Sequence, residues 1–138
     1  MRIMALDYGS KRIGVALSDP TGTIASPLEF IPARPEDRFL ARLREIIAEH
    51  DVGRIVLGMP RNMDGSYGPA AEAVRAFAEK LRAAIDLPLV FWDERLTTAM
   101  ANRFLIEGNM SRRRRKEKVD QTAAAILLQS YLDSPASS

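Results

Sequence analysis

Four acidic residues stand where the sequence pattern predicts that a strand ends or a helix begins. Asp7 closes the apolar segment 2–7, Asp93 and Glu94 follow the apolar segment 88–92, and Asp120 lies near the start of the last helical pattern. In an α/β sheet, ligands bind at the edge where the parallel strands end. Clustered carboxylates repel one another unless a proton or a cation neutralises them. The sequence therefore predicts a site for a hard divalent cation such as Mg²⁺ or Mn²⁺.

The composition of the 138-residue chain excludes several other chemistries. It contains no cysteine and a single histidine, His50. A cysteine nucleophile, a thiolate zinc site and a multi-histidine metal site are thereby ruled out. A serine triad would have to be built around His50, which reads as the end of an amphipathic helix. If the protein is an enzyme, carboxylates are therefore the expected catalytic groups. Two metal ions held by carboxylates catalyse displacement at phosphorus in many nucleases and phosphatases.

Positive charge is concentrated in one short run. The formal net charge is +2, but residues 112–118 contain six cations and one anion. The rest of the chain has 14 basic and 17 acidic residues, a net charge of −3. Such a run attracts phosphate without regard to sequence, as a phosphodiester substrate requires. The alternative is an ordinary solvated loop.

The elements that must position these residues begin with three strands. Turn residues separate the apolar segments 2–7, 12–18 and 23–31, which indicates an antiparallel meander. Beyond Pro35 the apolar residues recur at spacings of three and four, which is typical of helices.

Helices and strands then alternate. The expected elements are a helix from Pro35 that ends at Gly53, a strand over 54–60, a loop over 62–68, a helix over 69–86, a strand over 88–92, a helix from Thr97 or Thr98 to Glu107, and a helix over 119–132. This alternation implies parallel pairing through right-handed crossovers. The predicted fold class is α/β, a five-stranded mixed sheet in the order β-β-β-α-β-α-β-α-α with helices on both faces. In the last helix, Asp120 would begin a stripe that continues with Ala124, Leu127 and Tyr131 and faces the sheet.

Four segments together resemble one protein family. They are LDYGSKRIGVALSD at 6–19, GMPRNMDGSYGP at 58–69, DERLTT at 93–98 and RRKEKVDQTAAAILLQSYLD at 114–133. In this order they are similar to the YqgF or RuvX-type pre-16S rRNA nucleases, which are related to Holliday junction resolvases and have an RNase H-like fold.

The resemblance implies specific roles. Asp7, Glu94 and Asp120 would be the catalytic acids and would bind Mg²⁺ or Mn²⁺, expected to be two ions, beside the loop 58–65. Spacing alone leaves Asp93 and Glu94 open, because successive strand residues point to opposite faces, and only the resemblance favours Glu94. The candidate nucleic-acid-binding residues are Gly9, Lys11, Arg12, Asn62, Arg112, Arg113, Arg114, Arg115 and Lys116.

Each of these residues also has a plainer interpretation. Asp7 could merely initiate the turn that follows it, Gly9 and Gly14 could only permit tight turns, and Asn62 could be a turn former. Glu94 could pair with Arg95 or favour the N-terminus of the next helix.

The expected function is metal-dependent hydrolysis that processes the 5′ end of pre-16S rRNA, with pre-30S ribosomal particles as partners. Resolution of four-way DNA and non-catalytic RNA binding are the alternatives. The segment DYGSKRIGVA also resembles the phosphate loop of the actin and sugar kinase ATPases, but those enclose nucleotide between two such domains.

Length and hydropathy predict one domain over residues 1–133 and a disordered tail over 134–138. No apolar run approaches the ~20 residues that span a bilayer, and no signal sequence is evident. We expect a cytoplasmic protein without membrane contact, either a monomer or a weak homodimer.

Overall fold

The computed structural model describes residues 1–60, 66–94 and 122–137. Its elements are β1 (Arg2–Asp7), β2 (Arg12–Ser18), β3 (Ala25–Pro32), α1 (Glu36–His50), β4 (Val52–Met59), α2 (Pro69–Ala84), β5 (Leu89–Asp93), α5 (Ala123–Leu132) and the 3-10 helix η1 (Pro135–Ser137). The five strands form one sheet in the order β3-β2-β1-β4-β5. Strands β1, β2 and β3 pair antiparallel, while β1, β4 and β5 pair parallel. The predicted five-stranded mixed α/β sheet is confirmed.

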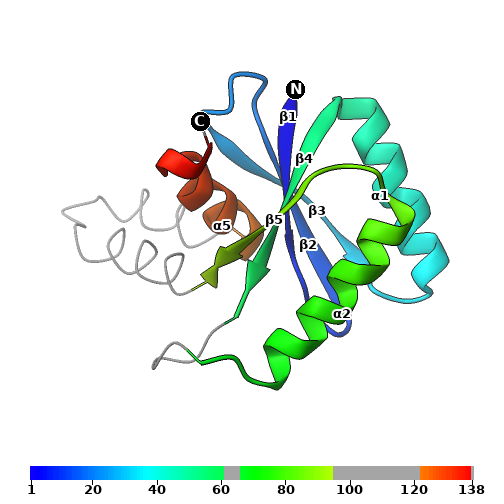
Figure 1. Ribbon diagram of the computed structural model, residues 1–138. Coiled ribbons are helices and arrows are strands. Elements are labelled where there is room, and N and C mark those ends of the chain that lie inside the picture. Colours follow the sequence, from blue (N-terminus) through cyan, green and yellow to red (C-terminus); the bar gives the residue numbers. More distant parts are fainter. Residues whose placement is uncertain (61–65, 95–121, 138) are drawn as a thin grey trace, which may run out of the picture.

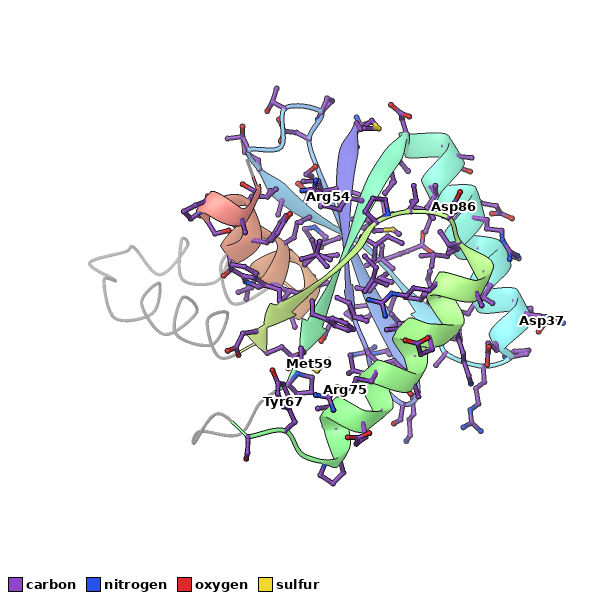
Figure 2. The ribbon with its side chains drawn as sticks, in the orientation of Figure 1. Asp37, Arg54, Met59, Tyr67, Arg75 and Asp86 are labelled. Carbon is purple, nitrogen blue, oxygen red and sulfur yellow. The ribbon has the colours of Figure 1, made fainter. Side chains whose placement is uncertain are left out.

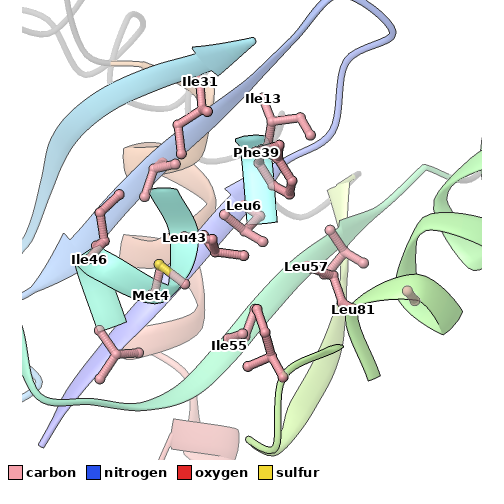
Figure 3. Close-up of a cluster of buried hydrophobic side chains, with 14 of the residues drawn as sticks. Met4, Leu6, Ile13, Ile31, Phe39, Leu43, Ile46, Ile55, Leu57 and Leu81 are labelled. Carbon is pink, nitrogen blue, oxygen red and sulfur yellow. The ribbon is translucent and has the colours of Figure 1, made fainter. Parts of the chain in front are cut away.

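Helices cover both faces of this sheet (Figure 1). On one face, α1 and α2 bury Phe39, Leu43 and Leu81 against Met4 and Leu6 of β1 (Figure 3). Helix α5 covers the other face and has its own smaller cluster. That cluster consists of Ala5, Ala16, Val56, Ala124, Ala125, Leu127, Leu128, Tyr131 and Leu132. Successive side chains of β1 belong alternately to these two clusters, so each residue of the strand can be assigned either to the face under α1 and α2 or to the face under α5.

Polar contacts fix α5 on its face of the sheet. Gln129 Oε1 accepts from the backbone N–H of Ala25 at 2.9 Å, and Gln129 Nε2 donates to the Thr23 carbonyl at 3.0 Å. Trp92 Nε1 donates to Ser130 Oγ at 3.0 Å, and Arg54 Nη1 donates to the Tyr131 hydroxyl at 2.7 Å. The helix is therefore tied to the start of β3 and to β4 and β5.

Several predicted boundaries differ from those of the structure. Helix α1 ends at His50, and the left-handed backbone of the next residue, Asp51 (φ 52°), makes the turn. Aspartate tolerates this conformation better than most residues. Gly53 lies inside β4, which begins at Val52 rather than at residue 54. Strand β3 begins at Ala25 rather than residue 23, because the Asp19 carboxylate accepts from the backbone N–H groups of Thr23 and Ile24 and holds both in the turn.

The start of the last helix also differs from the prediction. Helix α5 begins at Ala123, and the extended Thr122 caps it by accepting from the Ala125 N–H at 3.2 Å. The predicted stripe is otherwise confirmed, since Ala124, Leu127 and Tyr131 are all buried. Asp120 and the helix predicted from Thr97 or Thr98 to Glu107 lie outside the described residues.

Near the end of the chain, Pro135–Ser137 form the 3-10 helix η1. Ser137 Oγ donates to the Leu132 carbonyl at 2.9 Å, and the Tyr131 hydroxyl donates to the Ala136 carbonyl at 3.3 Å. The hydroxyl groups of Ser137 and Tyr131 thus supply hydrogen bonds that hold this segment, and the amino-acid composition does not predict them. None of the helices in the described part of the chain is long and apolar enough to cross a membrane.

Candidate active site

Asp7 ends β1 on the face that α5 covers. Met4 and Leu6 belong to the cluster under α1 and α2, and Ala5 belongs to the cluster under α5, so alternation places Asp7 on the α5 face. The next residue, Tyr8, packs its ring against Phe77 of α2 at a centroid distance of 4.8 Å. The backbone at Asp7 is therefore held between the two faces of the sheet.

Glycines occupy the strand positions on both sides of Asp7. Gly14 of β2 is its direct partner in the antiparallel register. On the other side, Leu6 pairs with Leu57, so Gly58 of β4 comes next along the strand. A Cβ at Gly58 would lie only 2.7 Å from Glu94 Oε1 and 3.1 Å from Glu94 Cγ. The Glu94 carboxylate thus lies over Gly58, reaching from the end of β5 across β4 toward Asp7.

The structure separates Glu94 from Asp93. Phe91 packs with the cluster under α1 and α2, whereas Val90 and Trp92 pack with the cluster under α5. Strand alternation therefore directs Asp93, the last residue of β5, toward the α1 and α2 face, and the contact over Gly58 fixes Glu94 on the α5 face. Glu94, which the resemblance favoured, is the acid that shares a face with Asp7.

Both carboxylates are destabilised in their ionised form. Burial raises the pKa of Asp7. Burial also raises the pKa of Glu94, and the negative charges of Asp7 and then Asp93 raise it further. Partly buried oxygen donors of like charge are the groups that a hard divalent cation stabilises, so their chemistry fits Mg²⁺ or Mn²⁺.

The third predicted acid, Asp120, lies outside the described residues. Within the described ranges, no group of three potential metal ligands is present. The two described acids alone therefore do not make a complete ligand set.

A groove of about 450 Å³ opens beside Asp7. Its lining comes from the end of β1, the turn after it, β2, β3 and the start of α5: Asp7, Gly9, Ser10, Lys11, Arg12, Gly14, Phe30 and Ala123. Three of the predicted nucleic-acid-binding residues, Gly9, Lys11 and Arg12, therefore lie beside Asp7. Asn62 and the cations Arg112 to Lys116 lie outside the described residues.

Gly9 is required by the turn itself. A Cβ at this position would lie 2.4 Å from the carbonyl oxygen of Arg12, a contact that real Cβ atoms do not make. The plainer interpretation of Gly9, a tight turn, is thus supported by geometry. His50 lies at the C-terminus of α1, just before β4, and so near the opposite edge of the sheet from Asp7.

Sequence reasoning missed two aromatic residues near this edge. Phe30 lines the groove, and the Arg12 guanidinium lies over its ring at 4.2 Å from the centroid. Tyr67 lies with Arg75 beside Met59 at the end of β4, the guanidinium 4.6 Å from the ring centroid (Figure 2). The available signal for Phe30 was strand alternation, which separates it from Glu29 and Ile31.

Known proteins match the chain over almost its whole length. The family model described as "RuvX: Holliday junction resolvase" matches residues 1–134. A protein of Moorella thermoacetica is 55% identical over 96% of this chain and 95% of its own length. A protein of Listeria monocytogenes is 49% identical over 96% of this chain and 98% of its own length. Both carry the name "Putative pre-16S rRNA nuclease".

Solved structures agree on the fold. T. thermophilus RuvC in complex with a Holliday junction substrate superposes with a TM-score of 0.58 at 13% identity, over 95% of this chain and 92% of that one. The fowlpox virus Holliday junction resolvase gives a TM-score of 0.51 at 13% identity, over 96% and 99%. At these identities the likeness establishes the RNase H-like fold. With the sequence matches, it shows that the chain belongs to the RuvX family, whose members are named as nucleases and resolvases.

Proposed function

We propose that the protein is a metal-dependent nuclease that hydrolyses phosphodiester bonds in the 5′ region of pre-16S rRNA. One observation carries the proposal: Asp7 and Glu94 share one face of the sheet at its carboxyl edge, and Lys11 and Arg12 line the groove beside Asp7. A site that joins carboxylates to cations in this way suits a polyanion that is cut with the help of a divalent cation. The names of the curated relatives support rRNA as the substrate. We further propose that pre-30S ribosomal particles are the setting of the reaction.

The acids have the binding role. Asp7 and Glu94, completed by Asp120, would hold one or two Mg²⁺ or Mn²⁺ ions. Such ions, when bound by carboxylates, activate water and stabilise the leaving oxygen of an in-line displacement. Because Gly14 and Gly58 have no side chains, the Phe30 ring can lie over Gly14 and the Glu94 carboxylate over Gly58, so that both lie close to Asp7.

The cations have the positioning role. Lys11 and Arg12 lie beside Asp7 and attract the phosphates that flank the scissile bond. The run Arg112 to Lys116 adds sequence-independent attraction for the same backbone. Asn62, which follows β4 in the sequence, is proposed to contact the substrate directly.

A cleavage assay tests the catalytic proposal. The wild-type protein with Mg²⁺ or Mn²⁺ is expected to cut a pre-16S 5′-leader RNA, and Asp7→Asn or Asp120→Asn should reduce the rate by about 100-fold or more. Asp86→Asn changes an exposed acid on the loop before β5 and serves as the control. Full activity in both site variants would remove the site assignment, and no cleavage with any divalent cation would favour a non-catalytic RNA-binding factor.

A second readout does not depend on activity. A cation that binds only the folded protein raises the midpoint of thermal unfolding. Mg²⁺ or Mn²⁺ should therefore raise the midpoint of the wild type and of Asp86→Asn, but much less that of Asp7→Asn. Equal shifts in all three proteins would place the cation elsewhere.

Resolution of four-way DNA is the second candidate, which the description of the family favours. Paired cuts require two active sites related by a two-fold axis, and hence a stable dimer. The same assay run on four-way DNA junctions, together with sedimentation of the protein at the assay concentration, separates the two. A monomer that cuts only RNA contradicts the resolvase activity.

A further inference from the structure

An aromatic ring lies in the same row of the sheet as Asp7. In the register of the antiparallel strands, Phe30 pairs with Gly14, and Gly14 pairs with Asp7. Two interstrand spacings, about 10 Å, separate the backbones of Phe30 and Asp7. Because Gly14 has no side chain, the ring can lie close to β2, with Phe30 Cε1 only 3.3 Å from the position that a Cβ would take.

This ring is not part of either core. Phe30 is 46% exposed, although it belongs to a row whose other members are buried or partly buried. A single exposed aromatic residue is ordinary on a protein surface. Phe30 differs because it lines the groove that contains Asp7 and because a cation covers its ring.

Arg12 extends the ring into a two-layer stack. Its exposed guanidinium lies 4.2 Å from the centroid of Phe30. A guanidinium is planar and stacks on π-systems, which the compact ammonium of lysine does not do. The stack therefore offers a flat surface and a positive charge together, the combination with which proteins hold the bases of single-stranded nucleic acids.

We infer that an unpaired base of the substrate stacks on the Arg12–Phe30 pair while the adjoining phosphate lies toward Asp7. This inference rests on the proposed nuclease function and specifies its substrate: a strand that is unpaired where it enters the site. Bases inside a duplex have their faces covered by their neighbours, so a fully paired helix cannot use this stack. Stacking is tolerant of sequence, because every base has a π-face.

Binding of matched RNAs without divalent cations tests the inference. The two probes are a fluorescently labelled single-stranded RNA and the same sequence in a full duplex. Phe30→Ala should bind the single strand roughly tenfold more weakly, the loss expected for one base–aromatic stack, and the duplex as tightly as the wild type. Leu28→Ala changes a neighbouring exposed residue of β3 outside the groove and should bind both RNAs normally.

Two further variants separate stacking from charge. Phe30→Tyr keeps the ring and should restore single-strand binding. Arg12→Lys keeps the charge but loses the plane, so it should weaken single-strand binding while the dependence of affinity on salt stays that of the wild type. Normal single-strand binding by Phe30→Ala, an equal loss on the duplex, or full binding by Arg12→Lys would each overturn the stacking role.

The same experiments distinguish this inference from the proposed function. A wild type that cleaves RNA, paired with a Phe30→Ala variant that binds the single strand normally, removes the base stack alone. If the wild type binds the single strand through Phe30 but shows no cleavage with any divalent cation, the catalytic proposal is removed and the base stack is retained.

Discussion

At the scale of single residues, the Asp7 carboxylate costs the folded protein free energy whenever it is ionised. Burial raises its pKa, so the folded state holds the proton more tightly than the unfolded state does. Stability on this account is greatest below the ordinary aspartate pKa and falls as the pH rises through the raised value. A functional group placed at such a cost indicates a site that a ligand completes.

Asp7→Asn should therefore stabilise the protein at neutral pH when divalent cations are absent. The gain over the wild type should be near zero below the ordinary aspartate pKa, grow as the pH rises through the raised pKa of Asp7, and stay constant above it. Thermal unfolding of both proteins across this pH range in the presence of a chelator measures the effect. A variant that is less stable than the wild type at neutral pH would contradict it.

Asp19 provides a control of opposite sign. Hydrogen bonds to its carboxylate, first from the backbone N–H of Ile24 and then from Thr21 and Thr23, hold its pKa well below the usual range. Asp19→Asn should therefore destabilise the protein at neutral pH, and the loss should shrink as the pH falls below the ordinary aspartate pKa. Asp7 in β1 and Asp19 in the turn after β2 should thus respond to the same substitution in opposite directions.

At the scale of elements, the carboxyl end of β4 determines where the Glu94 side chain lies. Gly58→Ala would place a Cβ 2.7 Å from Glu94 Oε1 and 3.2 Å from Leu127 Cδ2. The Glu94 carboxylate is the end of a flexible side chain and would move, so the fold should survive. We expect cleavage to fall by about tenfold or more, the cost of a displaced reacting group, with a smaller change in the unfolding midpoint.

Gly53→Ala is the matched control for this change. Gly53 lies in the same strand but at its other end, and the Cβ there would meet the exposed, flexible side chain of Met1. Rates of RNA cleavage and unfolding midpoints for the two variants test the comparison. Equal losses of cleavage in both would show that β4 as a whole, rather than the position beside Glu94, determines activity.

Elements with strong periodicity were predictable from the sequence, whereas positions set by tertiary contacts were not. Apolar segments bounded by turn residues predicted the five strands, and the order of strands and helices predicted the mixed pairing and the helices on both faces. The end of α1 was misplaced at Gly53, because the left-handed residue is Asp51. The start of β3 was misplaced because the Asp19 carboxylate extends the turn.

The candidate site was predictable in part. Asp7 at the end of β1 follows from the strand pattern, and Glu94 followed only from the family resemblance. To choose between Asp93 and Glu94, one must know whether Phe91 or Trp92 faces α5. Only the packing in the structure shows this. Phe30 was missed because one apolar residue in an edge strand looks like core until the groove beside it is known.

At the scale of the whole molecule, the proposed function assigns different roles to two groups of charges. The described acids Asp7 and Glu94 lie at the carboxyl edge of the sheet, while the run 112–118 contains six cations and one anion. On this proposal, attraction of the RNA backbone by the run and binding of the cation by the acids are separate properties of the chain. Changes to one should leave the other intact.

Replacement of Arg112 to Arg115 by serine tests this separation. If all four arginines contact phosphates of a single strand, the slope of log affinity against log salt should become shallower by about 3. The shift of the unfolding midpoint caused by Mg²⁺ should remain that of the wild type. An unchanged salt slope would contradict the role of these arginines in phosphate binding.

The row that runs from Phe30 through Gly14 and Asp7 to Gly58 has a consequence for mutational surveys of this family. Alanine scanning assumes that a substitution deletes atoms, and it interprets lost activity as a deleted contact. At Gly14 and Gly58, alanine adds a carbon atom to the space beside Asp7. A survey scored in the usual way would count both glycines as contributors of contacts, when each leaves room for a neighbouring side chain, Phe30 at Gly14 and Glu94 at Gly58.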